Sequence, residues 1–317
     1  MTYGTDGQPV TGAAVLARRG LTAEMAAPAS LARFSDGTHF RIEIPSVEGP
    51  EVLRAVVAEA AARKVTVNRV SQGSGAMLLS ASELAEMARI GADSGLEVSL
   101  FVGPREDWDI GRAAHSADGQ MLAGRLRGTR QLRYAVDDIV RAAEQGIRGF
   151  LIADPGLLRL VSDMRAAGQL PASIVWKVSA VLAPSNPLSF QVLEQLGGST
   201  INVPSDLTLG QLAEMRAASL LPIDLYVETP DSMGGVVRGH EAADLIAVAA
   251  PMYVKFGLRN SRPLYPCGLH LASEAAAIAR EKVHRAEVAL EWIGRSGLAL
   301  TQSGPGAKGL GLPEPQR

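Results

Sequence analysis

Residues 200–230 read TINVPSDLTLGQLAEMRAASLLPIDLYVETP and predict a strand, a helix and a second strand. The β-branched run TINV stops at a proline, and the Ser-Asp pair after it favours a helix start. Leucines and a methionine then recur at helical spacing. Polar and apolar residues alternate in IDLYVE, so we expect Asp224, Tyr226 and Glu228 on one face of the second strand.

A similar unit occurs earlier in the chain, at residues 66–104. Its TVN, LAEM and LFV segments align with the TIN, LAEM and LYV segments of the later stretch. A strand–helix–strand unit that recurs half a chain later is typical of two quarter-turns of an eightfold β/α barrel. Chance likeness between two α/β units is the alternative.

Eight predicted strands alternate with helical segments along the whole chain. They lie at residues 39–46, 65–70, 97–103, 149–154, 174–180, 200–205, 223–228 and 252–258. This alternation predicts an α/β protein with a closed (β/α)8 TIM barrel. An open doubly wound sheet would need a glycine-rich dinucleotide turn after the first strand, and EIPSVEGPE is not such a turn.

One barrel domain accounts for most of the 317 residues. We expect the barrel at residues 37–297. Residues 1–36 form a partly disordered lead-in, in which AAVLARRG and TAEMAAPASLARF are candidates for short helices on the barrel floor. Residues 298–317 are rich in glycine and proline, so we expect a disordered tail.

Composition restricts the partners and the location. The net charge is −2 and aromatic residues make up 4%, which argues against nucleic-acid binding. The single cysteine, Cys267, excludes an intramolecular disulfide and a cysteine-only iron–sulfur cluster. The sequence shows no secretory leader and no run of 18 apolar residues. These features predict a cytoplasmic protein with no membrane partner.

Polar residues gather where the predicted strands end. The carboxyl ends of the strands and the loops beyond them form the active site of a TIM barrel. Burying charge there is costly unless the groups are paired or hydrated, so we interpret this ring as functional. Its members are Glu43, Asn68, Asp154, Lys177, Asn202, Glu228, Lys255 and Arg259, with Tyr226 one layer below.

Lys177 and Lys255 lie within apolar strands, in WKVS and VKFG. Desolvation in a barrel mouth lowers the pKa of a lysine, which can then act as a Schiff-base nucleophile or a general base. The alternatives are ion pairs, of Lys177 with Glu43 or Asp154 and of Lys255 with Glu228, or simple binding of a substrate carboxylate.

Three carboxylates of the ring allow either proton transfer or metal binding. Glu43, Asp154 and Glu228 could serve as general acids and bases, or could hold a divalent cation with help from Asn68 and Asn202. The five histidines show no spacing typical of metal ligands. The cofactor therefore stays open between none and a divalent metal.

Two loops extend the predicted site. SQGSGAML, at residues 71–78, begins with Ser71 and offers hydroxyls and backbone amides to an anion, although such a stretch is more often a flexible connector. Residues 104–133 carry six arginines. A long loop after the third strand predicts a lid over an anionic substrate, with Trp108 as its apolar anchor, or a contact in a homo-oligomer.

At VTVNRVSQGSGAMLL, INVPSDLTLGQLAEMRA, IDLYVETPDSMGG and YVKFGLRN the chain resembles an actinobacterial group of peptidase U32-like proteins. The resemblance spans roughly residues 37–295 and implies a barrel-like catalytic domain and hydrolysis of peptides. Other branches of the family modify RNA or hydroxylate quinones with an iron–sulfur cluster. Their cysteine motif is absent here, so the resemblance carries over no catalytic residue and no cluster.

We therefore predict an enzyme that acts on a small carboxylated or phosphorylated metabolite, of the lyase, aldolase or isomerase type. The predicted catalytic residues are Lys177, Lys255, Glu228 and Glu43. The predicted substrate-binding residues are Asn68, Asn202, Arg259, Asp154, Tyr226 and Ser71. A U32-like hydrolase and a non-catalytic barrel that binds a ligand or a partner are the alternatives.

Overall fold

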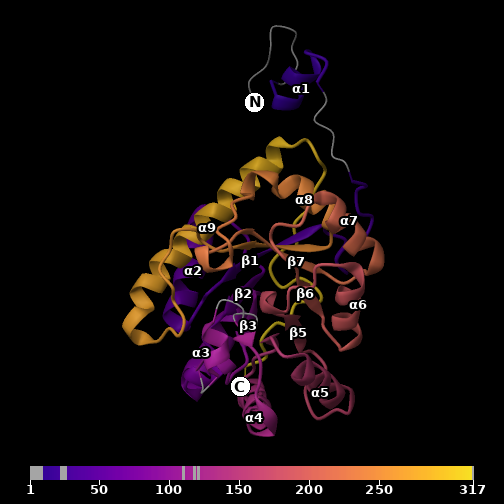
Figure 1. The fold of residues 1–317 in the computed structure, drawn as a ribbon. Helices are drawn as coiled ribbons and strands as arrows, with labels where there is room; N and C mark the ends of the chain where they lie inside the picture. The colour runs from indigo at the N-terminus through magenta and orange to yellow at the C-terminus, as the bar shows by residue number, and fades with distance from the viewer. Residues whose placement is uncertain (1–9, 22–26, 109–110, 117–118, 120–121, 316–317) are drawn as a thin grey trace.

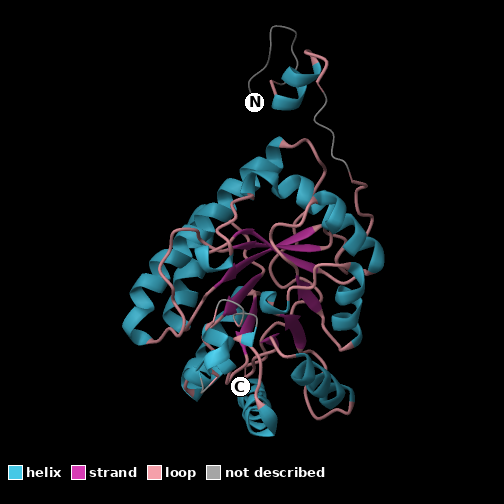
Figure 2. Ribbon diagram, in the orientation of Figure 1, coloured by secondary structure: helices cyan, strands magenta, loops and turns pink. Residues whose placement is uncertain are grey.

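The computed structural model describes residues 10–21, 27–108, 111–116, 119 and 122–315. Eight parallel strands close into a barrel in the order β1 to β8, and helices surround it (Figures 1 and 2). The predicted (β/α)8 architecture is therefore confirmed, and the open doubly wound sheet is excluded.

Each strand pairs in parallel with the next, and β8 pairs with β1. β2 begins four residues after its predicted start, although Val65 and Val67 before it are buried. This difference matters for the site, because it decides which β2 side chains enter the barrel. The strands are β1 (Phe40–Pro45), β2 (Arg69–Gln72), β3 (Glu97–Phe101), β4 (Gly149–Ile152), β5 (Val175–Val178), β6 (Thr200–Asn202), β7 (Ile223–Glu228) and β8 (Met252–Phe256).

Helix starts carry local signals that the structure uses. Ser80 and Glu83 form the capping box that begins α3, and a proline occupies the first turn of α2, α5 and α6. The helices are α1 (Gly12–Ala17), α2 (Pro50–Arg63), α3 (Ala81–Ser94), α4 (Gly128–Glu144), α5 (Pro155–Ala166), α6 (Pro187–Gln195), α7 (Leu209–Ala218), α8 (Ala242–Ala249) and α9 (Ala272–Arg295).

The hydrophobic core lies between the barrel and the helices. Outward-facing side chains of the strands, such as Ile42, Ile44 and Leu225, pack into one apolar cluster with the inner faces of the helices. α9 lies against α2 and covers β1 and β8 (Figure 1). The aliphatic side chains of the strands pack in this outer layer, so the polar faces of the strands line the inside of the barrel. Among the described residues, no helix combines the length and apolar character needed to cross a membrane.

The N-terminal lead-in differs from its prediction. α1 forms, but it buries no residue and lies apart from the barrel instead of packing on its floor (Figure 1). The second predicted helix falls partly outside the described residues, and its remaining part, at 27–34, is not helical. Residues 1–9, for which we predicted disorder, also lie outside the described residues.

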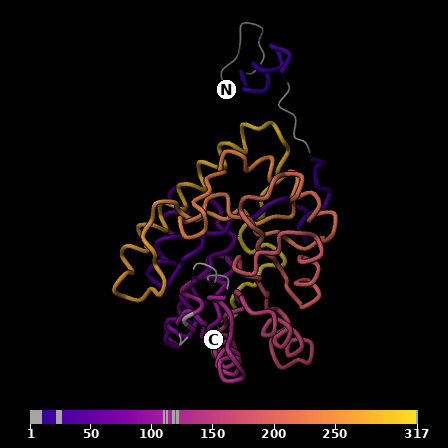
Figure 3. Tube along the Cα trace, viewed as in Figure 1, coloured from indigo at the N-terminus to yellow at the C-terminus, as the bar shows by residue number. Residues whose placement is uncertain are grey.

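The predicted disorder of the C-terminal tail is wrong for its described part. Residues 301–315 run across the end of the barrel where the strands begin (Figure 3). The backbone amides of Ser303, Gly306 and Glu314 donate to the backbone oxygens of Phe40, which begins β1, and of Gly95 and Gly146, which come shortly before β3 and β4. Glycine and proline content suggested disorder, but these partners, which are distant in sequence, fix the tail in place. The tail therefore forms the floor of the barrel.

Candidate active site

Five buried charged side chains meet inside the barrel, each from a different strand. They are Glu43 from β1, Arg69 from β2, Lys177 from β5, Asp224 from β7 and Lys255 from β8. We call them the interior charge cluster. All five side chains are at most 2% exposed, so their energies depend on one another rather than on water.

Glu43 is the centre of the cluster. Its carboxylate accepts hydrogen bonds from Arg69 Nε and Ser71 Oγ, both at 2.7 Å. Lys177 Nζ contacts Glu43 Oε1, and Lys255 Nζ lies 3.6 Å from the same oxygen. Burial alone would raise the pKa of Glu43, but Arg69, Lys177 and Lys255 hold it well below its ordinary value. Glu43 is therefore a carboxylate at neutral pH.

Arg69 joins Glu43 to the floor side of the cluster. Its Nη2 lies 2.6 Å from both Glu43 Oε2 and Asp224 Oδ2, and its Nη1 donates to Thr200 Oγ1 at 3.1 Å. The guanidinium also stacks on Tyr253, 3.5 Å from the ring centroid. Sequence reasoning missed Arg69, because the predicted start of β2 put Asn68 inward and Arg69 outward.

The two lysines approach the same oxygen of Glu43 from β5 and β8. Burial lowers the pKa of Lys177 to about 7, and Glu43 only partly opposes this effect. Burial also lowers the pKa of Lys255. Lys255 Nζ contacts Asn202 Oδ1 and lies 3.9 Å from the ring centroid of Tyr226, which is only half-buried. Of the two lysines, Lys255 is therefore the one that contacts a partly exposed side chain, that of Tyr226.

Charge balance favours one neutral amine in this cluster. Arg69 carries one positive charge against the two carboxylates of Glu43 and Asp224. Glu97, 3.7 Å from Arg69, is a third buried acid, but burial raises its pKa and so disfavours its charge, and one protonated lysine therefore brings the group closest to neutrality. A second protonated lysine would leave a net charge in a dry interior, which is costly. We infer that the pair holds one ammonium and one free amine near pH 7.

The lowered pKa of Lys177 predicts a specific pH dependence of stability. Between pH 7 and about 10.5 an unfolded chain keeps the proton that the folded protein has released, so stability should rise with pH in this window. The free energy of unfolding of the parent protein, relative to Lys177→Met, should therefore increase from pH 7 to 9.5. Urea denaturation at several pH values measures it. A constant difference between the two proteins would contradict the neutral amine.

The loop from β3 to α4 contacts the loop after β2 through Arg105. Arg105 lies between two aromatic rings, 3.7 Å from the ring centroid of Phe101 and 4.2 Å from that of Trp108, and it donates to the backbone oxygen of Gly73. Trp108 thus packs against Arg105 rather than against an apolar wall, and its role as the anchor of a lid stays a prediction. The loop is shorter than predicted, because α4 begins at Gly128.

The neighbouring loop after β2 is not a free anion site. The backbone amides of Gly73 and Ser74 donate to the buried carboxylate of Glu48, each at 2.9 Å. The amide of Gly75 donates to the side chain of Gln72. The amides that we expected to hold a substrate anion thus have partners within the protein.

Asn68 is not at the mouth. Because β2 starts at Arg69, Asn68 lies before the strand, at the floor. Its Oδ1 accepts from the amide of Ile42, and its Nδ2 donates to the backbone oxygen of Ser303 in the tail, each at 3.0 Å. The early predicted start of β2 caused this error, and the likeness of TVN to TIN does not hold in the structure, since Asn202 lies at the other end of its strand.

Asp154 does not point into the barrel either. It is the N-cap of α5, where Oδ1 accepts from the amide of Leu157 at 2.9 Å. Its other oxygen accepts from the amide of Leu126 at 3.2 Å. A carboxylate between a strand and a helix can either point into the barrel mouth or cap the helix, and Asp154 caps the helix.

Glu228 leaves the inward face because β7 is irregular between Tyr226 and Glu228. Its carboxylate accepts from the amide of Arg259 at 3.1 Å and lies 3.7 Å from Arg285 Nε on α9. The Arg259 side chain is 60% exposed and faces Asp231. Glu228 and Arg259 are therefore not part of the interior charge cluster.

The expected metal site of Glu43, Asp154 and Glu228 does not form. These carboxylates belong to the barrel interior, a helix cap and the α9 side of the molecule, respectively. Within the described part of the chain, no group of three or more His, Cys, Asp or Glu residues is arranged to hold a metal ion. The donor set required for a divalent cation is not assembled here.

Six of the ten predicted site residues do lie together inside the barrel. Glu43, Ser71, Lys177, Asn202 and Lys255 are linked by the contacts above, and Tyr226 lies under the amine of Lys255. Their catalytic and binding roles stay predictions. Asp224 shares their face as the alternation in IDLYVE indicates, and Arg69 completes the set.

A scan against models of known protein families and a search of curated proteins found no match to the chain. Among solved structures it is similar to a U32 peptidase, at 17% identity over 59% of this chain and 69% of that one (TM-score 0.40). It is also similar to 2,3-dimethylmalate lyase, a member of the PEP mutase/isocitrate lyase superfamily, at 12% identity over 95% and 91% (TM-score 0.46). A third is dihydrodipicolinate synthase, at 10% identity over 81% and 79% (TM-score 0.41). Similarity of this degree does not assign the chain to a family or an activity.

Proposed function

We propose that the chain is an enzyme that acts on a small carboxylated or phosphorylated carbonyl compound at the mouth of the barrel, with lyase, aldolase or isomerase chemistry. The observation that carries this proposal is the pair of buried lysines on one carboxylate oxygen of Glu43. A lysine that is neutral at physiological pH is a competent nucleophile toward a carbonyl, and a second nearby cation helps to keep it neutral.

We assign the nucleophile to Lys255, because it borders half-buried Tyr226 and lies farther from Glu43 than Lys177 does. Lys177, whose pKa of about 7 lets it hold or release a proton near neutral pH, would carry the one proton of the pair while Lys255 attacks. The Lys255 amine would add to the substrate carbonyl carbon, and the carbonyl oxygen would leave as water after taking up two protons. The resulting iminium withdraws electrons from an adjacent C–H or C–C bond, which is the step shared by aldolases and lyases of this type. Lys177 and Glu43 would hold and return the protons, and Asn202 would orient the amine.

Reductive trapping tests this assignment. The purified protein would be treated with sodium borohydride and a panel of 2-oxo acids that includes pyruvate and glyoxylate, and adducts would be located by intact mass and peptide mapping. We expect one adduct, on Lys255, which Lys255→Met removes. Lys64→Met is the matched control, because Lys64 is an exposed lysine at the end of α2. Adducts spread over exposed lysines, or none with any member of the panel, would argue against a Schiff base.

A non-catalytic barrel is the second candidate. The observation that favours it is that the carboxylate of Glu43 already has its hydrogen-bond partners within the protein. Both oxygens of this carboxylate are engaged by neighbouring side chains, as in a network that only stabilises the fold. On this view Lys255→Met changes stability and nothing else. A protein that forms no adduct, turns over no 2-oxo acid and still binds a small anion at the mouth would establish it.

The U32-like hydrolase that the sequence resemblance implies has less support. Burial, with a smaller contribution from Glu48, raises the pKa of the Cys267 thiol to about 11, so it is not poised as a thiolate nucleophile. Release of amines from a peptide pool by the purified protein, blocked by a metal chelator, would restore this candidate.

A further inference from the structure

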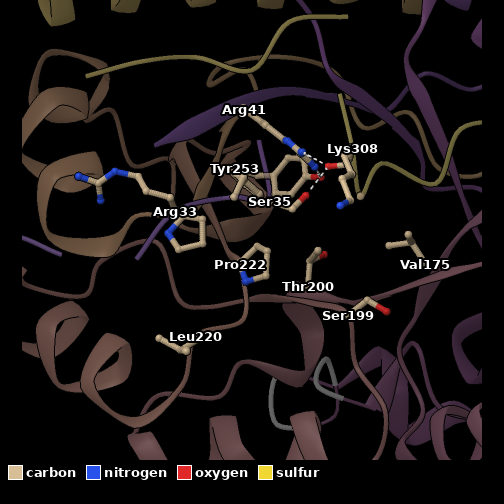
Figure 4. Close-up of a pocket in the computed structure, with 13 residues that line it drawn as sticks. Arg33, Ser35, Arg41, Val175, Ser199, Thr200, Leu220, Pro222, Tyr253 and Lys308 are labelled. Carbon is tan, nitrogen blue, oxygen red and sulfur yellow. Dashed lines mark hydrogen bonds between the residues drawn. The ribbon is translucent and has the colours of Figure 1, made fainter. Parts of the chain in front are cut away.

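A pocket lies on the floor of the barrel, at the opposite end from the mouth (Figure 4). We call it the floor pocket. Its volume is about 240 Å³, the volume of about eight water molecules in the liquid. Its walls come from residues 33–35 of the lead-in, from the starts of β1, β5, β6 and β8, and from residues 308–309 of the tail. Three distant parts of the sequence are therefore needed to build it.

The charged side chains that line the floor pocket are all basic. They are Arg33, Arg41 and Lys308, and no aspartate or glutamate is among its described lining residues. Arg33 Nη1 donates to the backbone oxygens of Ser30 and Ala32, which do not neutralise its charge. Lys308 is exposed. The pocket thus presents a net positive potential to a ligand.

Arg41 gives the pocket a rigid wall. Its Nη2 donates to the backbone oxygen of Lys308 at 2.7 Å, and its Nη1 donates to the hydroxyl of Tyr253 at 3.0 Å. Its guanidinium stacks on Phe34, 4.0 Å from the ring centroid. Asp36, at 3.7 Å, offsets part of its charge, so Lys308 supplies most of the uncompensated charge at this end of the pocket, while the Arg33 guanidinium points away from it (Figure 4).

The other side of the pocket is mainly apolar. Figure 4 shows Arg41, Lys308, Tyr253 and Ser35 gathered on one side, with Pro222 on the other. Leu220, Val175 and Pro251 extend the apolar surface, and Thr200 and Ser199 add hydroxyls. A ligand that fits both sides carries an anionic group at one end and an apolar body at the other.

We propose that the floor pocket binds a small organic anion, a carboxylate or phosphate attached to an apolar body. The floor pocket borders the interior charge cluster from the floor side, whereas the proposed substrate would enter from the mouth. Thr200 lies at this border: it lines the floor pocket, and its hydroxyl donates to Asp224 and accepts from Arg69 in the cluster.

Phenyl phosphate is the probe for this site, titrated calorimetrically into the full-length protein at low salt. Lys308→Glu should weaken its binding about tenfold, because an exposed attraction is replaced by a repulsion. The variant should fold normally, since Arg41 uses only the backbone oxygen of residue 308. Lys64→Glu makes the same charge change at an exposed position outside the pocket and should leave the affinity unchanged.

Further measurements separate this site from the mouth. Lys255→Met should not alter phenyl phosphate binding if the floor pocket is the site. Affinity that is lost in Lys255→Met but kept in Lys308→Glu would place the probe at the mouth and overturn the inference, while leaving the proposed function intact. Equal losses of phenyl phosphate affinity in Lys308→Glu and Lys64→Glu would also overturn the inference, as would a parent protein that does not bind phenyl phosphate. Inorganic phosphate should bind more weakly than phenyl phosphate; equal affinity would contradict the apolar half of the site.

Discussion

Glu43→Gln should lower the free energy of unfolding by about 3–5 kcal/mol, the usual cost of breaking a fully buried ion pair. Glutamine keeps the shape of the side chain but removes the charge that faces Arg69, Lys177 and Lys255. Lys177 can relieve part of this cost by losing its proton, so we expect the loss near the lower end of that range above pH 7. Urea denaturation monitored by circular dichroism measures it.

Glu97→Gln is the matched control for this variant, because Glu97 is an equally buried glutamate on the inside of the same barrel. Burial raises the pKa of Glu97, and Arg69, at 3.7 Å, only partly opposes this effect. Burial thus works against the charge of Glu97, so replacing it with a neutral amide removes a less favourable charge than at Glu43, and the substitution should cost much less. Equal losses in the free energy of unfolding of Glu43→Gln and Glu97→Gln would show that the cluster does not depend on Glu43 as its counter-ion.

The two glutamates should also give opposite pH dependences. The pKa of Glu43 is lowered in the folded protein, so its contribution to stability is present above pH 4.5 and is lost as the pH falls through its folded pKa. The pKa of Glu97 is raised, so its contribution is present below pH 4.5 and is lost as the pH rises through its folded pKa. Acid titration of each variant against the parent protein separates these two effects.

Removing the tail should have the second large effect. A chain that ends at Leu300 loses the backbone oxygen of Lys308 and the hydroxyl of Ser303, both of which accept from buried Arg41. It also loses the amide of Gly311, which donates to Glu97 at 2.9 Å. An unsatisfied buried polar group costs about 1–3 kcal/mol, so we expect a total loss of about 4 kcal/mol or more.

A shorter deletion tests whether this loss comes from the contacts or from chain length. A chain that ends at Gly309 keeps both partners of Arg41, but it loses the bonds of Gly311 to Glu97 and of Glu314 to Arg148. Its free energy of unfolding should lie between that of the parent protein and that of the longer deletion. Two truncated proteins as stable as the parent would show that the tail only lies against the floor without stabilising it.

Local sequence patterns were sufficient to predict the fold and those six of the ten candidate site residues that lie together inside the barrel. The β-branched runs and helical periodicities were sufficient to predict eight alternating units, because such patterns report burial one element at a time. Alternation within single strands also placed Glu43, Lys177, Lys255 and Asn202 inward, because successive side chains on a strand point to opposite faces.

What the sequence by itself determined is therefore the order of the elements and the polar inner faces of most strands. Only the tertiary structure decided which end of the barrel each residue occupies. The true start of β2 moved Asn68 to the floor and Arg69 into the cluster, and an irregularity in β7 turned Glu228 toward α9. The tail, for which composition predicted disorder, is ordered by partners up to 273 residues away in sequence. Such contacts join distant segments, and local periodicity carries no information about them.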